Sequence, residues 1–215
     1  EADFRARAAA FQSAYTDHAV PGSVSYAGKA FLSATTVRWL AEAGLGLDVC
    51  TGGELALACA AGFPAERISL HGNNKTQAEF AAALSAVVGR YVLDSLEEID
   101  RLADLAAQAG VVADVLVRVT TGVEAHTHEF IATGQDDSKF GFNLGNGDAL
   151  RAVDRARRSR AVNLVGIHCH IGSNVFEASS FAKAAEVMAA FAVPLDLPEL
   201  VLGGGLGVAY VEGEE

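Results

Sequence analysis

The chain is 215 residues long; 51% of its residues are hydrophobic and 20% are charged. That balance predicts a packed globular core and excludes an intrinsically disordered chain. Asp and Glu number 27 against 16 Lys and Arg, which gives a formal net charge of −11. This acidic balance argues against nucleic acid as a partner, because a phosphate backbone requires a basic footprint, and against a polybasic membrane anchor.

The cysteines and the apolar runs indicate the cellular setting. Cys50, Cys59 and Cys169 are far apart and form no C-x-x-C pair, so neither a disulfide framework nor a structural zinc site is expected. A reducing, cytoplasmic setting follows. No apolar run is expected to reach the roughly 18 residues of a membrane helix. Because the chain lacks an initiator Met and stops soon after a glycine-rich run, we expect a piece of a longer protein, truncated at both ends.

Short β-branched runs alternate with longer Ala- and Leu-rich stretches along the chain. The runs predict strands at Ser23–Ala27, Leu47–Cys50, Arg67–Leu70, Tyr91–Leu93, Val115–Val119, Val162–His168 and Leu200–Leu202. The longer stretches predict helices at Ala34–Ala43, Gly53–Ala61, Gln77–Val87, Leu96–Ala109, Asp148–Arg157 and Ala178–Ala192. Ser or Thr before several of these helices, and Gly after several, are the expected caps.

Strand–helix alternation at this spacing predicts βαβ units and a parallel sheet. An open doubly wound sheet would satisfy the strand count as well as a barrel. We favour an α/β fold of the (β/α)8 TIM-barrel type, incomplete in this chain, because polar residues follow nearly every strand and a barrel collects them at one face. Residues 1–215 are expected to form this single barrel domain. The irregular stretch Thr120–Lys139 is too long for a passive connection and is expected to be an active-site loop.

The seventh predicted strand is followed directly by Gly203, Gly204 and Gly205. Consecutive glycines let backbone N–H groups approach an anion closely, because no Cβ stands in the way. Barrels often bind phosphate in the loops after strands seven and eight. A tight strand-to-helix turn without a ligand is an equally good interpretation of this run taken alone.

Lys29 follows the first predicted strand, in Ser25-Tyr-Ala-Gly-Lys-Ala30. At the carboxyl end of a barrel strand its amine would point to the barrel mouth. Burial there would disfavour the charged ammonium and make the amine available for imine formation. A solvated lysine is the commoner interpretation of any single Lys. A phosphate loop on the same face favours the imine, because pyridoxal phosphate needs both.

His168 and His170 are two residues apart at the end of the sixth predicted strand, so both imidazoles should face one side. One imidazole could stack on an aromatic cofactor, with Ser173 donating to a phosphate oxygen. Alternatively, His-x-His on a barrel strand is a metal-ligand pattern of zinc or nickel hydrolases. That interpretation is disfavoured, because no His follows to complete the site. Structural histidines are the third interpretation. For the His126-Thr-His128 repeat we favour a polar lid over a metal pair.

Other polar residues follow the remaining predicted strands, and each taken alone could be an ordinary cap or surface residue. Their placement at one rim of a barrel is what suggests a site. They are Asp48 and Glu54, the run His71-Gly-Asn-Asn-Lys75, Asp94, and Arg118.

Several stretches of the sequence resemble the diaminopimelate decarboxylase family, particularly its actinobacterial form. The resemblance runs from about Asp3 to Tyr210. The stretches are Tyr26-Ala-Gly-Lys-Ala-Phe31, Leu47-Asp-Val-Cys-Thr-Gly-Gly-Glu-Leu55, Leu70-His-Gly-Asn-Asn-Lys75, Gly122-Val-Glu-Ala-His-Thr-His-Glu-Phe130, Asp137-Ser-Lys-Phe-Gly141, Gly166-Ile-His-Cys-His-Ile-Gly-Ser173 and Leu202-Gly-Gly-Gly-Leu-Gly207.

The resemblance implies a fold-type III pyridoxal 5'-phosphate decarboxylase that converts meso-2,6-diaminopimelate to L-lysine and CO2, the last step of lysine biosynthesis. It implies that Lys29 holds the cofactor as a Schiff base and that His170 stacks on the pyridine ring. Ser173 and the Gly203–Gly205 amides would bind the phosphate. Asp48 and Arg118 would also bind the cofactor, and Glu54 and Lys139 would line the pocket. It also implies a homodimer with a shared active site.

The family's later Glu-Pro-Gly-Arg segment, its C-terminal β domain and the Cys and Tyr donated by the partner subunit are absent from this sequence. The residues that select the substrate are therefore expected beyond Glu215. Decarboxylases of ornithine, arginine or carboxynorspermidine share the barrel and remain alternatives. A non-catalytic pyridoxal-phosphate-binding barrel and a His-x-His metal hydrolase are less favoured.

Overall fold

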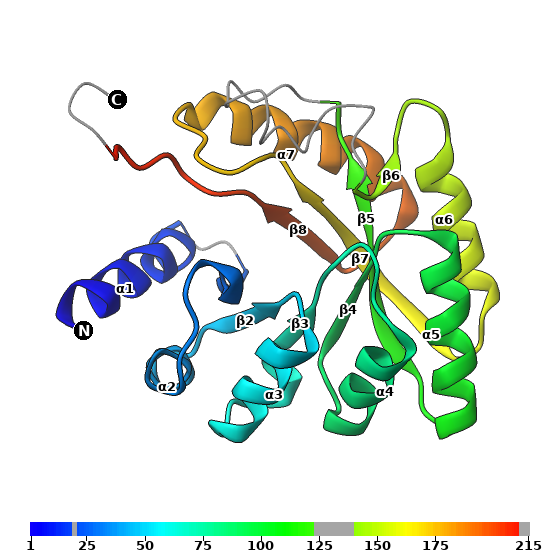
Figure 1. The fold of residues 1–215 in the computed structure, drawn as a ribbon. Helices are drawn as coiled ribbons and strands as arrows, with labels where there is room; N and C mark the ends of the chain where they lie inside the picture. The colour runs from blue at the N-terminus through cyan, green and yellow to red at the C-terminus, as the bar shows by residue number, and fades with distance from the viewer. Residues whose placement is uncertain (19–20, 123–139, 211–215) are drawn as a thin grey trace. The chain divides into compact units, whose positions relative to one another are not determined.

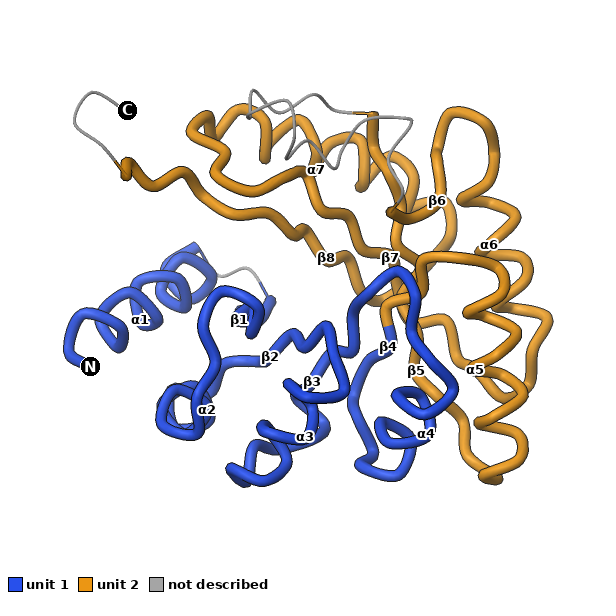
Figure 2. Tube along the Cα trace, in the orientation of Figure 1, with its two compact units in different colours: residues 1–91 blue, residues 92–215 orange. Residues whose placement is uncertain are grey.

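The structure is a computed structural model that describes residues 1–18, 21–122 and 140–210. The chain divides into two compact units, Glu1–Tyr91 and Val92–Glu215, coloured separately in Figure 2. Both are built from parallel strands connected through helices (Figure 1).

The described residues of the first unit, 1–18 and 21–91, form four helices, two 3-10 turns and three complete strands, followed by the start of a fourth strand. In chain order they are α1 (Ala2–Thr16), β1 (Ser25–Ala27), η1 (Gly28–Ala30), α2 (Ala34–Glu42), β2 (Gly46–Val49), α3 (Gly52–Ala60), η2 (Ala65–Arg67), β3 (Ile68–Leu70), α4 (Gln77–Ala86) and β4 (Arg90–Leu93). Parallel pairs join β1 to β2, β2 to β3 and β3 to β4. Leu47, Val49 and Ile68 are fully buried on these strands, which explains the apolar runs in the sequence.

In the second unit, β5 (Ala113–Thr120) pairs in parallel with both β6 (Phe142–Asn143) and β7 (Val162–His170), and β7 pairs with β8 (Glu199–Gly203). The helices are α5 (Leu96–Ala109), α6 (Asp148–Arg158) and α7 (Ala178–Ala192), followed by the turn η3 (Val193–Leu195). Val115, Val117 and Ile167 are fully buried on the strands. Figure 1 shows α5 and α6 side by side, and both contact β5.

Every predicted strand and helix forms, and α5 and α7 have the predicted bounds. Apart from the 3-10 turns, one helix and one strand were not predicted. In α1 only Ala8 is buried, so no apolar stripe marks the helix in the sequence. The helix is anchored by a few contacts, including Phe4 with Trp39 at 5.7 Å between ring centroids, and Arg5 with Glu42 at 2.7 Å. The strand β6 is too short to give a sequence pattern. Because β6 adds one strand to the count, the strand that leads into the glycine run is the eighth in chain order and not the seventh.

We expected no apolar run long enough for a membrane helix, and that expectation is wrong for one segment. Ala178–Leu195, which joins α7 and η3, is 18 residues long with a mean hydropathy of 1.2, enough by length and composition to cross a membrane. Its helical part, α7, contacts β7 and β8. These are the contacts of a helix that covers a parallel sheet.

Glu79 joins the starts of two helices in the first unit. Its carboxylate accepts the N–H of Thr76, the N-cap of α4, at 2.9 Å and the N–H of Gly52, the first residue of α3, at 3.0 Å. The pKa of Glu79 is lowered from its ordinary value, and the hydrogen bond from the Thr76 N–H is the largest cause. The Thr76 hydroxyl, Gly52 and the Lys75 ammonium add to it, and burial opposes it.

We expect Glu79→Gln to remove a pH-dependent part of the stability. Because the pKa of Glu79 is lowered in the folded state, its carboxylate stabilises the fold above its unfolded pKa. That contribution is lost as the pH falls through the lowered folded value. The difference in unfolding free energy between wild type and variant, measured by urea denaturation, should therefore be greater at neutral pH than in acid. A difference that stays constant down to acidic pH would contradict this account.

Val87 ends α4 in a conformation that its side chain disfavours. Its φ is 57° and its ψ is 50°, the left-handed region, and the residue is 73% exposed. A β-branched residue in this region strains the backbone, and an exposed valine loses little on removal. We expect Val87→Gly to raise the unfolding free energy by about 1 kcal/mol. Val112→Gly is the control. Val112 is also exposed, but its φ is not positive, so glycine relieves no strain there and should destabilise the protein.

Candidate functional site

Lys29 is the central residue of η1, the turn that directly follows β1. Gly28 is buried, and a Cβ built on it would lie 3.0 Å from the carbonyl oxygen of Asp48, so the turn lies against β2 with little room for a side chain at this position. Lys29 itself is exposed. The expected burial of its amine is therefore wrong, and its position is set by the backbone of the turn.

Asp48 and His71 meet at the carboxyl ends of β2 and β3. Their Oδ1 and Nε2 atoms are 3.5 Å apart, and both side chains are largely shielded from solvent. Glu54 lies in the first turn of α3, where its carboxylate accepts the N–H of Cys50 at 2.5 Å. Its own N–H donates to Thr51, the N-cap of the helix. In the first unit, Glu54 thus holds the exit of β2 against the start of α3.

The second unit brings His170, Ser173 and the glycine run together at the ends of β7 and β8. His170 is the register partner of Gly203 across the two strands. Beyond the strands the two segments stay paired, since Gly205 donates its N–H to Gly172 at 2.9 Å and Val175 donates to Gly205 at 2.9 Å. A Cβ on Gly205 would lie 3.5 Å from the Cα of Ser173.

Glycine is required at the first two positions of this run. A Cβ on Gly203 would lie 2.9 Å from Nε2 of His168 and 3.2 Å from Nδ1 of His170, so both imidazoles face the same position, as the spacing predicted. A Cβ on Gly204, whose φ is 153°, would lie 2.9 Å from the ring of Phe181. The bare backbone next to an imidazole and a serine fits a phosphorylated aromatic group.

Cys169 lies between the two histidines and is buried. Burial raises the pKa of its thiol to about 11, although the N–H of Gly203 and the charge of Arg118 oppose the shift. The thiol therefore stays protonated at neutral pH and is no nucleophile.

Arg118 lies on β5, opposite His168 in the register with β7. Its Nη1 is 3.6 Å from Oδ2 of Asp94, and the side chains are 10% and 2% exposed. The guanidinium carbon lies 4.6 Å from the centroid of the Phe140 ring. Asp94 is itself fixed, because its N–H donates to the carboxylate of Glu98 at 3.0 Å. The ion pair thus holds Arg118 inside the second unit.

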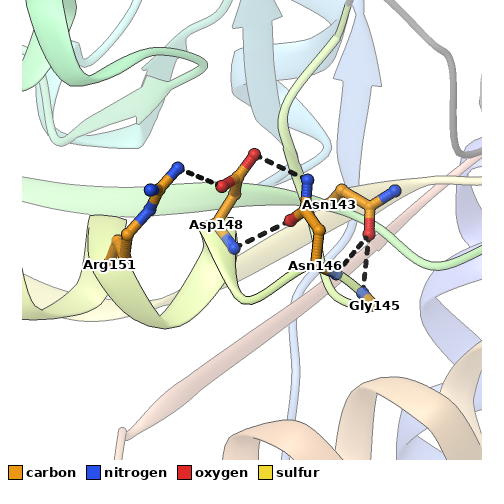
Figure 3. Close-up of polar contacts among 5 residues, drawn as sticks. All are labelled: Asn143, Gly145, Asn146, Asp148 and Arg151. Carbon is orange, nitrogen blue, oxygen red and sulfur yellow. Dashed lines mark hydrogen bonds and ion pairs between the residues drawn. The ribbon is translucent and has the colours of Figure 1, made fainter.

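Side-chain amides fix the loop between β6 and α6, which sequence reasoning did not single out. Oδ1 of Asn143 accepts the N–H of Gly145 at 2.6 Å, and Oδ1 of Asn146 accepts that of Asp148 at 2.9 Å (Figure 3). Asp148 also binds Arg151. Beside this loop is an open pocket of about 200 Å³, lined by Asp94, Ser95, Leu96, Glu97, Phe142, Asp148 and Arg151.

Some predicted residues lie outside the described part of the chain, namely Lys139, His126, His128 and most of the predicted active-site loop. Among the described residues, no group of three His, Cys, Asp or Glu side chains could hold a metal ion. Lys29, Asp48 and Glu54 belong to the first unit, and Arg118, His170, Ser173 and the glycine run belong to the second.

The sequence model of the family "Pyridoxal-dependent decarboxylase, pyridoxal binding domain" matches residues 1–215. Diaminopimelate decarboxylase of Mycobacterium tuberculosis is 47% identical over 225 residues, which is 100% of this chain and 50% of that protein. The Bacillus subtilis enzyme of the same name is 46% identical over 98% of this chain and 49% of its own length. The chain therefore spans about half the length of the curated relatives it matches.

A crystal structure of diaminopimelate decarboxylase from M. jannaschii, in complex with L-lysine, has a similar fold. The TM-score is 0.82 at 34% identity, over 90% of this chain and 46% of that one. The prediction of an α/β fold of the (β/α)8 barrel type, incomplete in this chain, is confirmed by this likeness and by the family match.

Proposed function

We propose that this chain is the cofactor-binding barrel domain of an amino-acid decarboxylase. The chain belongs to the pyridoxal-binding domain family of the pyridoxal-dependent decarboxylases. The proposed substrate is meso-2,6-diaminopimelate and the products are L-lysine and CO2. Relatives that carry the name diaminopimelate decarboxylase at 46% and 47% identity support this choice. A solved relative with L-lysine bound supports it too, since L-lysine would be the product.

One observation carries the proposal: His170, Ser173 and the Gly203–Gly205 backbone meet at the ends of β7 and β8. A flat imidazole beside a hydroxyl and a glycine backbone can bind an aromatic ring that carries a phosphate. His170 would stack on the pyridine ring. Of the three glycine N–H groups, that of Gly205 donates to Gly172 and that of Gly203 to Cys169. We therefore assign the phosphate first to the Ser173 hydroxyl and the Gly204 N–H.

In the first unit, Lys29 would hold the cofactor through its Nζ, and Asp48 would line the same pocket. Asp48 is held by His71, and Glu54 fixes the strand exit that follows Asp48. Arg118, held by Asp94 and Phe140, would supply a fixed positive charge from the second unit. Pyridoxal 5'-phosphate, when bound, supplies the electron sink that makes loss of CO2 from an amino acid feasible.

We extend the proposal to the assembly: the enzyme is a cytoplasmic homodimer with a shared active site, and Lys139 contributes to the pocket. Analytical ultracentrifugation of the full-length protein tests the dimer. A monomer that is fully active would contradict a shared site.

The substrate is tested by CO2 release from the full-length protein supplied with pyridoxal 5'-phosphate. We expect release from meso-2,6-diaminopimelate, with L-lysine formed in equal amount, and far slower release from ornithine, arginine or carboxynorspermidine. Faster release from one of these three substrates would assign the protein that activity instead. Cofactor binding without any CO2 release would indicate a non-catalytic barrel, and activity that depends on a bound metal would indicate a hydrolase.

A further inference from the structure

One side-chain hydrogen bond closes the turn that carries Lys29. The hydroxyl of Tyr26, on β1, donates to the carbonyl oxygen of Phe31 at 3.0 Å. Between these residues lies η1, a single 3-10 turn, and its N-cap, Ala27, makes no side-chain hydrogen bond. Phe31 is extended, with φ −170° and ψ 122°, so the chain leaves the turn at this residue. The Tyr26 bond therefore ties the strand before Lys29 to the backbone after it.

The opposite side of the turn is held by β2. Ala27 is the register partner of Asp48, and the buried Gly28 approaches the Asp48 carbonyl oxygen so closely that a Cβ would lie 3.0 Å from it. The Lys29 side chain is exposed, so side-chain packing does not set its direction. Two contacts thus fix this turn, the β2 contact at its start and the Tyr26 hydroxyl at its end.

Tyr26 is itself anchored by an aromatic cluster from α1 and α2. Its ring lies 5.6 Å from that of Phe4 at an interplanar angle of 62°, an edge-to-face contact. Phe4 lies 5.7 Å from the ring of Trp39. Burial raises the pKa of the Tyr26 hydroxyl, so the hydroxyl keeps its proton and remains a donor.

We propose that Tyr26 is a positioning residue for Lys29: its hydroxyl closes the turn and holds the lysine amine where the cofactor aldehyde reaches it. The inference rests on the proposed function, because it requires Lys29 to be the lysine that bonds to the cofactor. Tyr26 touches neither cofactor nor substrate in this role. It acts by restricting the backbone of η1, which lowers the entropy lost when the amine is brought into line with its reaction partner.

The test uses full-length protein from which the cofactor has been removed, in wild-type, Tyr26→Phe and Tyr15→Phe forms. Tyr15→Phe is the matched control, since it removes a hydroxyl from another partly exposed tyrosine of the same unit. Pyridoxal 5'-phosphate is added, samples are reduced with borohydride at intervals, and the adduct on Lys29 is quantified by peptide mass. We expect Tyr26→Phe to slow adduct formation roughly five- to tenfold, the scale of one hydrogen bond, and Tyr15→Phe to leave it unchanged.

A second measurement separates positioning from general damage to the pocket. 4'-Deoxypyridoxine phosphate keeps the ring and the phosphate but has no aldehyde, so it binds without bonding to lysine. We expect all three proteins to bind it with equal affinity. An unchanged adduct rate in Tyr26→Phe would overturn this inference while the Lys29 assignment stands. So would equal losses of adduct rate and analogue affinity, which would make Tyr26 purely structural. A wild-type protein with no adduct on Lys29 would overturn both the inference and the lysine assignment.

Discussion

Replacing Lys29 with alanine in the full-length protein is expected to lower decarboxylase turnover by about 10³-fold or more, since in the proposed function this amine bonds to the cofactor. The fold should be unaffected, because Lys29 is exposed in the turn after β1. Steady-state CO2 release, together with thermal unfolding, checks both parts. Lys183→Ala removes an exposed lysine from α7 and serves as the control. Turnover close to wild type in Lys29→Ala would remove Lys29 from the mechanism.

Replacing Asp94 with alanine is expected to have the largest effect on stability. The change leaves the Arg118 guanidinium, whose side chain is 10% exposed, buried without this carboxylate. Removing one partner of a buried ion pair lowers the unfolding free energy by about 3 kcal/mol or more. Because Arg118 is among the proposed cofactor-binding residues, the variant should also bind pyridoxal 5'-phosphate more weakly. Urea denaturation measures the first effect, and cofactor titration measures the second.

The control for Asp94→Ala is Asp100→Ala. Asp100 forms a 2.6 Å pair with Arg155, but both side chains are about half exposed. Water screens such a pair, so its loss should change stability little. Equal destabilisation by the two substitutions would show that burial is not what makes the Asp94–Arg118 pair important.

Most of the fold could be predicted because its signals are local. β-Branched runs mark the buried strands, and Ser33, Thr51 and Thr76 cap the helices that follow them. The two missed elements lack such signals: α1 buries only Ala8, and β6 is formed by Phe142 and Asn143 alone. Their positions depend on tertiary contacts, which the local sequence does not encode.

The candidate site was predicted in part for the same reason. The glycine run and the His-x-His spacing are local patterns, and the structure brings Gly203 and both histidines together. The burial of a residue at a strand exit depends on which distant segments cover it. For that reason Lys29 was wrongly expected to be buried. Likewise, no sequence pattern pairs Asp94 with Arg118, which lie on different elements.

In the proposed function, every other residue of the site acts around a bond between Lys29 and pyridoxal 5'-phosphate. The most direct test is to reduce the full-length protein, loaded with excess cofactor, with borohydride, digest it and locate the pyridoxyl group by mass. We expect a single adduct, on the peptide that contains Lys29. An adduct on another lysine, or none anywhere, would contradict it.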